Sequence, residues 1–457
     1  MKLDWNGLLR GRQKPEDGAE VELDGEVFPL DDAPSDRLLL VQEAACCAGG
    51  LPSPETTIDV RLSAPAPLGR TVSVTGIWRR LSDEASWRWR IEGARVVPRA
   101  TNGPWLSRRA ILAAPLLCAA PRARAAARVA PDAGRALAAG GGGADMHSHT
   151  GRVIFRKSLL ERNFVPVAVP MREGGMAIVS LAIVSDTPVA TLWRPFREPD
   201  PGELWANGQA AFARLHQLAD HDQLDIVVDR ASLARCVRSG AQPAIVVASE
   251  GADWMDDRIE RLDWAFREQR LRHLQLTHMR PNDLGDIQTM PAVHNGLSDF
   301  GAEVVRGCNR LGIVVDVAHA PFSLVVRTAS VSSKPIVLSH TALAPQPGLY
   351  SRLISAEHAR VVAQTGGVVG VWPVCGGTPA PGVYARNIAY MVDAVGIDHV
   401  GIGSDMAGLG SQPNPFERYT DMPALLQALL ELGFSTEEVR KLSGGNYARV
   451  LAATLPA

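Results

Sequence analysis

The chain has 457 residues, 46% of them hydrophobic and 21% charged, which is a globular composition and excludes a disordered or fibrous protein. The 47 Lys and Arg residues nearly balance the 49 Asp and Glu residues, so the net charge of −2 gives no sign of a nucleic-acid partner. Six cysteines without a CxxC pair argue against a cysteine-bound zinc ion and against a disulfide scaffold.

The first 100 residues contain short stretches in which apolar and polar residues alternate. These stretches include Val21 with Leu23, Ile58 with Val60 and Leu62, Val72 with Val74, and Trp87 with Trp89 and Ile91. Alternation with a period of two is typical of β-strands that have one face in contact with water. We therefore expect a small antiparallel β domain over residues 1–100, and an OB-like, five-stranded barrel is one form that it would take. The sequence does not indicate its role.

Residues 101–143 have a different composition and separate two domains. Arg108 and Arg109 precede an apolar stretch over 110–120, and the segment ends in a run of glycines. This pattern is typical of a twin-arginine export signal followed by a flexible linker, although such signals act at an N-terminus. An Ala-rich linker helix is the alternative. If the signal is used, the twin-arginine export machinery is a partner and the protein is periplasmic or extracellular; if not, it is cytoplasmic.

From residue 144 the sequence becomes regular, with apolar runs separated by stretches of helical character. The runs span residues 144–149, 177–185, 244–250, 271–278, 313–319, 335–340, 366–373 and 399–405. Continuous Val, Ile and Leu runs are typical of parallel strands buried on both faces. Eight of them alternating with helices predict an α/β fold, a (β/α)8 TIM barrel over residues 144–457. A ninth run at 224–228 is assigned to an insertion between the second and third strands.

Six of the eight runs end in side chains that can bind a metal ion or a substrate. These side chains are His147, His149, Glu250, His278, His319, His340 and Asp405. The carboxyl ends of barrel strands meet at one face, so residues far apart in sequence can form one pocket there. Imidazole nitrogens and carboxylate oxygens are natural zinc ligands. A single carboxylate can bridge two metal ions, so the pattern predicts a site able to hold a pair.

Seven segments in this order resemble the membrane dipeptidase (renal dipeptidase-like) family of the amidohydrolase superfamily. They are DMHSHTG, IVVASEGAD, LTHMRPN, VVDVAHA, IVLSHTAL, HVGIGSDMAG and GGNYARV. The resemblance covers residues 144–455 and implies a (β/α)8 barrel with two zinc ions. It also implies a metallopeptidase that cleaves dipeptides, including those with a C-terminal D-residue, through a hydroxide that bridges the metals.

The resemblance further implies which residues hold the two zinc ions. Glu250 would bridge both of them. His147 and His149 would complete one site, and His319 with His340 would complete the other.

Three residues receive roles in catalysis and substrate binding from the same resemblance. Asp405 would sit beside the bridging hydroxide as proton acceptor and donor, and His278 would polarise the scissile carbonyl. Arg352, in the loop after the sixth strand, matches the family's arginine for the substrate carboxylate.

One position departs from the family. The family usually has His-x-Asp at the first strand, whereas this chain has His147-Ser148-His149, the form found in the wider superfamily. The change makes the site one charge more positive and leaves metal loading and the preferred substrate open. A lactonase or a non-peptide amidase on the same barrel is therefore an alternative function. For the oligomeric state, the sequence leaves a homodimer open. A binding protein with a degenerate site is disfavoured, because the set of ligands is complete.

Overall fold

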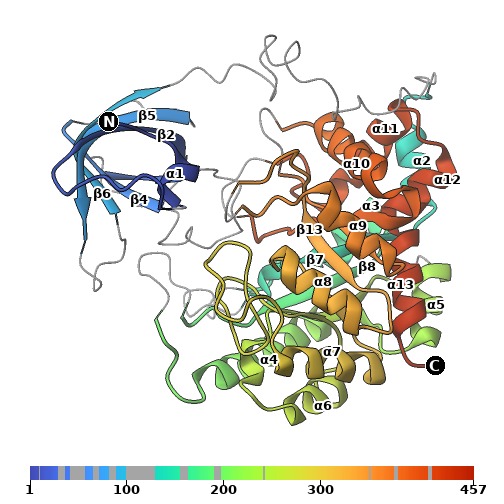
Figure 1. Cartoon of the computed structure of the whole chain (residues 1–457). Coiled ribbons are helices and arrows are strands. Elements are labelled where there is room, and N and C mark those ends of the chain that lie inside the picture. The colour runs from blue at the N-terminus through green and yellow to red at the C-terminus, as the bar shows by residue number, and fades with distance from the viewer. Residues whose placement is uncertain are drawn as a thin grey trace. The chain divides into compact units, whose positions relative to one another are not determined.

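The structure is a computed structural model, and it describes residues 1–9, 11–28, 37–41, 57–64, 71–81, 89–98, 129–154, 163–189, 197–239, 242–348, 351–374, 379–409 and 414–457. The chain divides into two compact units, one with strands β1–β6 and the other with strands β7–β15 (Figure 1). Among the described helices, none is both long and apolar enough to cross a bilayer. The expected export signal around Arg108 and Arg109 lies outside the described residues.

The N-terminal unit is a five-stranded barrel with one added strand and a short helix. Its elements are β1 (Lys2–Leu3), α1 (Trp5–Leu9), β2 (Glu20–Phe28), β3 (Arg37–Val41), β4 (Thr57–Leu62), β5 (Thr71–Arg80) and β6 (Trp89–Pro98). The strands follow the order β2-β3-β4-β6-β5, and β5 pairs again with β2, which closes the ring. Alternate side chains such as Val21, Leu23, Val72 and Val74 fill its core. The expected OB-like barrel is confirmed.

The expectation that this barrel is purely antiparallel is wrong at one pair. Strands β4 and β6 run parallel, while the other neighbours in the ring are antiparallel. An odd number of strands cannot alternate in direction around a closed ring, so a five-stranded barrel must contain a parallel pair.

The second unit is the expected eight-stranded parallel barrel. Its strands are β7 (Gly143–Ser148), β8 (Met176–Val184), β10 (Ala244–Glu250), β11 (Leu271–Gln275), β12 (Val314–Asp316), β13 (Val337–Thr341), β14 (Val368–Val371) and β15 (Val400–Ile402). Each pairs in parallel with its neighbour in this order. The ring closes where Ser148 bridges to Met406 and the Asp405 N–H donates to the His147 carbonyl oxygen over 3.0 Å. The ninth run forms β9 (Asp225–Ile226), which pairs with β10.

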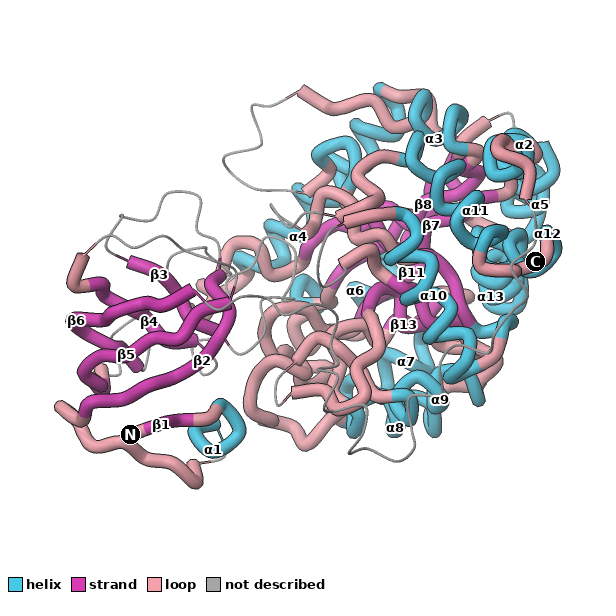
Figure 2. The backbone as a smooth tube through the Cα atoms, turned by 90° about the horizontal axis from the view of Figure 1, so that it is seen from above, coloured by secondary structure: helices cyan, strands magenta, loops and turns pink. Residues whose placement is uncertain are grey.

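Helices surround these strands, which lie at the centre of the unit (Figure 2). The helices are α2 (Ala133–Ala139), α3 (Ala168–Gly174), α4 (Glu203–His221), α5 (Arg230–Ser239), α6 (Glu260–Arg267), α7 (Asp299–Leu311), α8 (Phe322–Val331), α9 (Ala356–Gln364), α10 (Pro381–Val395), α11 (Met422–Glu431), α12 (Thr436–Arg440) and α13 (Asn446–Thr454). A large apolar cluster fills the layer between strands and helices. A smaller cluster joins Val450 and Leu451 of α13 to residues near the starts of several strands, such as Val314 and Val337.

Several strands are shorter than the sequence suggests, and the difference concerns site residues. The sequence predicts that His278, His319 and Asp405 end their strands, but β11, β12 and β15 end three residues before them. His319 and Asp405 have φ angles of 66° and 48°, in the left-handed region that a strand cannot continue through. Non-glycine residues held in this way cluster at functional sites.

Candidate metal centre and active site

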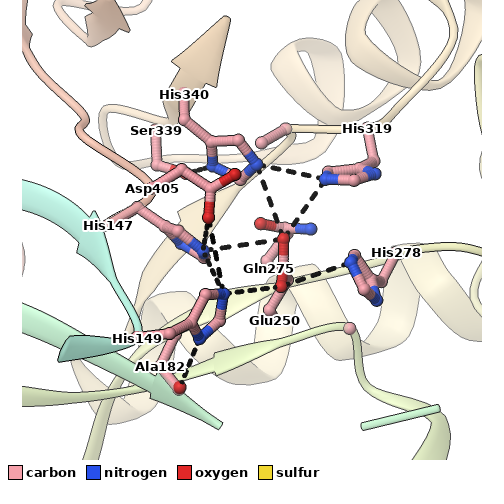
Figure 3. A network of polar contacts seen from close by, with 12 residues as sticks. His147, His149, Ala182, Glu250, Gln275, His278, His319, Ser339, His340 and Asp405 are labelled. Atoms are coloured by element: carbon pink, nitrogen blue, oxygen red, sulfur yellow. Dashed lines mark hydrogen bonds and ion pairs between the residues drawn. The ribbon is translucent and has the colours of Figure 1, made fainter. Parts of the chain in front are cut away.

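The side chains predicted from the strand ends form one buried cluster (Figure 3). The cluster consists of His147, His149, Glu250, His278, His319, His340 and Asp405, none of which is more than 5% exposed. Glu250 is the last residue of β10, and His147 and His340 lie within β7 and β13. The convergence expected at the carboxyl ends of the strands is therefore present.

Glu250 lies at the centre of the cluster, and both of its oxygens face imidazole nitrogens. Oε1 lies 3.2 Å from Nε2 of His319 and 3.5 Å from Nε2 of both His147 and His340. Oε2 lies 3.0 Å from Nε2 of His149 and 3.2 Å from Nε2 of His278. Because both of its oxygens face ring nitrogens, this carboxylate is placed to contact two cations at once.

In His149 and His340, Nδ1 has a partner outside the cluster, while Nε2 faces the cluster. Nδ1 of His149 donates to the Ala182 carbonyl oxygen over 2.9 Å, and Nδ1 of His340 lies 2.9 Å from the Ser339 hydroxyl. A carbonyl oxygen can only accept, so Nδ1 of His149 carries a proton and Nε2 is the nitrogen left to bind a cation. Partners of this kind orient metal-binding histidines.

The spacing of the ring nitrogens fits bound metal ions. Nε2 of His147 lies 3.2 Å from Nε2 of His149, and Nε2 of His319 lies 3.1 Å from Nε2 of His340. Two neutral ring nitrogens at this separation can both direct their lone pairs at one cation. Nitrogen and carboxylate donors are also the set that zinc prefers. The residues therefore fit a metal centre, with His149 taking part in it.

Protonation in the cluster follows from burial and from the charge of Glu250. Burial raises the pKa of Glu250, but the surrounding histidines outweigh it and hold the pKa well below its usual range. Burial lowers the pKa of His147 to about 3, against the attraction of Glu250. For His149 burial is again the largest effect, but contacts with Glu250 and Asp405 raise the pKa overall. An ionised Glu250 and a neutral His147 are the forms that bind metal ions.

Asp405 and His278 lie close enough to the other donors to bind a metal ion themselves. Three groups of donor atoms could each hold an ion: His147 with His149 and Asp405, His147 with Glu250 and His340, and Glu250 with His278 and His319. Oδ1 of Asp405 lies 3.6 Å from Nε2 of His149 and 3.9 Å from Nε2 of His147. Their division into ligands and catalytic groups remains a prediction.

Arg352 is buried in the loop after β13. Residues 346–352 group with the N-terminal unit rather than with the barrel. The position of Arg352 relative to the cluster therefore stays a prediction based on the sequence.

Three buried carboxylates around the cluster were not singled out from the sequence. Asp145 accepts hydrogen bonds from the Ser404 N–H over 2.9 Å and from the Tyr419 hydroxyl over 3.1 Å, and burial raises its pKa to about 6. Asp316 accepts the Ser339 N–H over 3.0 Å. Both aspartates tie neighbouring strands together just before a predicted metal ligand, and an acidic residue inside an apolar run was the available signal. The third carboxylate is Asp186, which contacts His278.

The fold and the site define a (β/α)8 barrel with a candidate metal centre at the carboxyl ends of its strands. The chain belongs to the membrane dipeptidase family, peptidase family M19, whose model matches residues 203–455. The resemblance inferred from the seven segments is confirmed. The match begins after β8, so the His147-Ser148-His149 segment lies before it.

Curated relatives of this chain are dipeptidases. A dipeptidase of Claviceps purpurea is 28% identical over 241 residues, which cover 50% of this chain and 55% of that protein. Human dipeptidase 3 is 27% identical over 255 residues, which cover 52% of this chain and 49% of that protein. The chain thus spans about half the length of the curated relatives it matches.

Solved structures share the fold of the barrel unit. A probable dipeptidase from Pseudomonas aeruginosa aligns with a TM-score of 0.59 and 19% identity, covering 70% of this chain and 97% of that one. A metallopeptidase from Rhodobacter sphaeroides, solved with a phosphinate mimic of the dipeptide L-Ala-D-Ala, aligns with a TM-score of 0.58 and 22% identity, covering 69% and 99%.

Proposed function

We propose that this chain is a zinc-dependent dipeptidase with two metal ions in the barrel. The observation that carries the proposal is the position of Glu250, whose two oxygens face the imidazole nitrogens of five histidines. Membership of the membrane dipeptidase family supports hydrolysis of dipeptides. The dipeptide mimic bound by the Rhodobacter sphaeroides protein supports a substrate with a C-terminal D-residue.

Each residue of the cluster has a task in this proposal. His147 and His149 would hold one zinc ion, His319 and His340 would hold the other, and Glu250 would contribute to both sites. The chemistry that such ions would supply when bound is a water molecule of lowered pKa and polarisation of the peptide carbonyl.

Two groups then act on the substrate. Asp405 accepts the proton of the attacking water and passes it to the leaving amine. His278, with a proton on each ring nitrogen, donates from Nε2 to the carbonyl oxygen and stabilises the charge that develops there.

Arg352 selects substrates with a free carboxylate in this proposal. A guanidinium binds a carboxylate through two parallel hydrogen bonds. A longer or amidated peptide offers this guanidinium no carboxylate at that place, and a lost charged hydrogen bond costs ~1.5–3 kcal/mol. Arg352→Met should therefore slow cleavage of free dipeptides by roughly ten- to a hundredfold while the metal content stays unchanged. Equal loss on free and amidated dipeptides would contradict this role.

The proposal is tested by elemental analysis together with a panel of substrates. We expect close to two zinc ions per chain, and activity that is lost with a chelator and returns with zinc. The panel contains L-Ala-L-Ala, L-Ala-D-Ala, their C-terminal amides and a set of lactones. Cleavage of the free dipeptides supports the proposal, whereas activity in the metal-free protein would refute it.

A lactonase or a non-peptide amidase is the second candidate. His149 at the position of the family's usual aspartate favours it, because a more positive centre changes the substrate that the site prefers. Faster turnover of the lactones than of the dipeptides would establish this alternative.

Export remains a separate proposal, based on the sequence of residues 101–143. The twin arginines Arg108 and Arg109 would send the folded barrel through the twin-arginine machinery to the periplasm or the medium. Replacing both with lysine should retain the protein in the cytoplasm, and unchanged export would contradict the proposal.

A further inference from the structure

Asp186 is a buried carboxylate at the carboxyl end of the barrel, in the turn that follows β8. It has no exposed surface. Its Oδ1 accepts a hydrogen bond from Nδ1 of His278 over 2.8 Å, and its Oδ2 accepts the Met279 N–H over 2.9 Å. One carboxylate therefore holds both the ring of His278 and the backbone that follows it.

The contact with Asp186 determines where the other nitrogen of His278 points. A carboxylate accepts, so Nδ1 of His278 donates, and Nε2 is turned to within 3.2 Å of Oε2 of Glu250. The His278 ring also lies against His319, with a centroid separation of 4.7 Å. Asp186 thus reaches the cluster through His278.

The position of Asp186 is itself fixed relative to Glu250. The N–H of the preceding residue, Ser185, donates to the Glu250 carbonyl oxygen over 3.0 Å. The Ser185 hydroxyl donates to Oδ2 of Asp253 over 2.6 Å, and Oδ1 of Asp253 accepts from Arg280 over 3.2 Å. Burial and the nearby charge of Asp186 raise the pKa of Asp253 to about 6. These contacts join the ends of β8 and β10 to the segment after β11.

We propose that Asp186 is a positioning residue for the reaction: it holds the ring of His278 so that Nε2 faces the substrate carbonyl. This inference rests on the proposed peptidase function. It adds a role for the second strand, which supplies none of the residues predicted from the strand ends. Carboxylate partners of this kind keep the donor ring in the geometry that catalysis needs.

Steady-state kinetics of the zinc-loaded protein test the role in catalysis. Asp186→Ala should lower kcat for the fastest-cleaved dipeptide of the panel by roughly ten- to a hundredfold. KM and the content of two zinc ions should stay close to those of the wild type. If the alanine variant does not fold, the nearly isosteric Asp186→Asn variant is measured instead, and the same changes in kcat, KM and zinc content are expected.

A double-mutant cycle separates positioning of His278 from a general structural effect. If Asp186 acts through His278, adding Asp186→Ala to a His278→Ala variant should cause little further loss of kcat. If the losses of kcat from the two single variants multiply in the double variant, the proposal is overturned. Loss of zinc from the Asp186 variants would overturn it as well. Asp222→Asn is the matched control, because Asp222 also accepts two backbone N–H groups, those of Val167 and Ala168, away from the cluster. It should leave kcat unchanged.

A measurement without substrate keeps this inference separate from the proposed function. In protein with ¹⁵N-labelled histidines and bound zinc, NMR should show a slowly exchanging proton on Nδ1 of His278, assigned by its absence in His278→Ala. The signal should be lost in Asp186→Ala. An unchanged signal would overturn the positioning role even if the enzyme cleaves dipeptides, and a lost signal supports it even if lactones prove to be the substrate.

Discussion

Gly251, directly after Glu250, packs closely against side chains of the candidate active site, and its replacement gives a sharp test of the geometry. Its φ angle is +77°, in a region that L-residues rarely adopt. A Cβ atom there would lie 2.2 Å from the Ser185 hydroxyl oxygen, 2.9 Å from Oδ2 of Asp253 and 3.1 Å from Cβ of His278. All three neighbours would have to move, including Cβ of His278.

The cost of Gly251→Ala has two parts. Holding alanine in a left-handed conformation costs roughly 1–2 kcal/mol, and forcing an extra methyl group into a filled space costs a further ~1–3 kcal/mol. The free energy of unfolding should therefore fall by about 2–5 kcal/mol. Hydrolysis of dipeptides should also be strongly reduced, because Glu250 and His278 would shift.

Gly202 provides a matched control. Its φ angle is also +77°, but a Cβ atom at this position would meet no heavy atom within 4 Å. Gly202→Ala should therefore show only the backbone cost of roughly 1–2 kcal/mol. Calorimetry measures the loss of unfolding free energy of the barrel in both variants. The unfolding transition of the barrel is the one whose midpoint temperature rises when zinc is added. Equal destabilisation by the two substitutions would refute the close packing around Gly251.

Three further outcomes are expected. Glu250→Gln should remove both zinc ions together, whereas His340→Ala should leave close to one, as elemental analysis would show. The folded-state pKa of Asp253, about 6, lies above its reference value of 3.8, so the folded protein binds this proton more tightly and gains stability as the pH falls through 6 toward about 4. Asp253→Asn should remove about 2 kcal/mol of that gain, measured as the difference in unfolding free energy between pH 7.5 and 4.5. Ser435 caps α12 by accepting the Glu438 N–H over 3.2 Å, so Ser435→Ala should lower barrel stability by about 1 kcal/mol in calorimetry.

The barrel and most of the cluster could be predicted because two patterns coincide in the sequence. Buried parallel strands give continuous apolar runs, and functional residues stand where the runs end. Glu250 follows six apolar or small residues on β10 and is the last residue of that strand. His319 and Asp405 were also found, although left-handed backbone places them beyond the ends of β12 and β15.

Asp186 shows where this reasoning fails. It follows the second run directly, but aspartate is also common in turns, and its partner His278 lies 92 positions along the chain. Only the fold brings the two together. The parallel pairing of β4 with β6 was missed for a related reason, since closure of a ring is a property of all five strands and not of any single one.

The way in which the large barrel closes gives the predicted metal ions a second role, which is to stabilise the contact between its first and last strands. Its first and last strands meet through few contacts, among them the bridge from Ser148 to Met406 and the hydrogen bond from Asp405 to His147. The donor atoms of His147, His149 and Asp405 also lie close enough to hold one ion. If Asp405 binds as a ligand instead of carrying a proton, that ion would connect the two edges and close a loop from residue 147 to residue 405. Clips across long loops confine the unfolded chain the most. Removal of the ion should therefore loosen the barrel first along this edge, so that amide protons of β7 and β15 exchange with solvent earlier than those of β10.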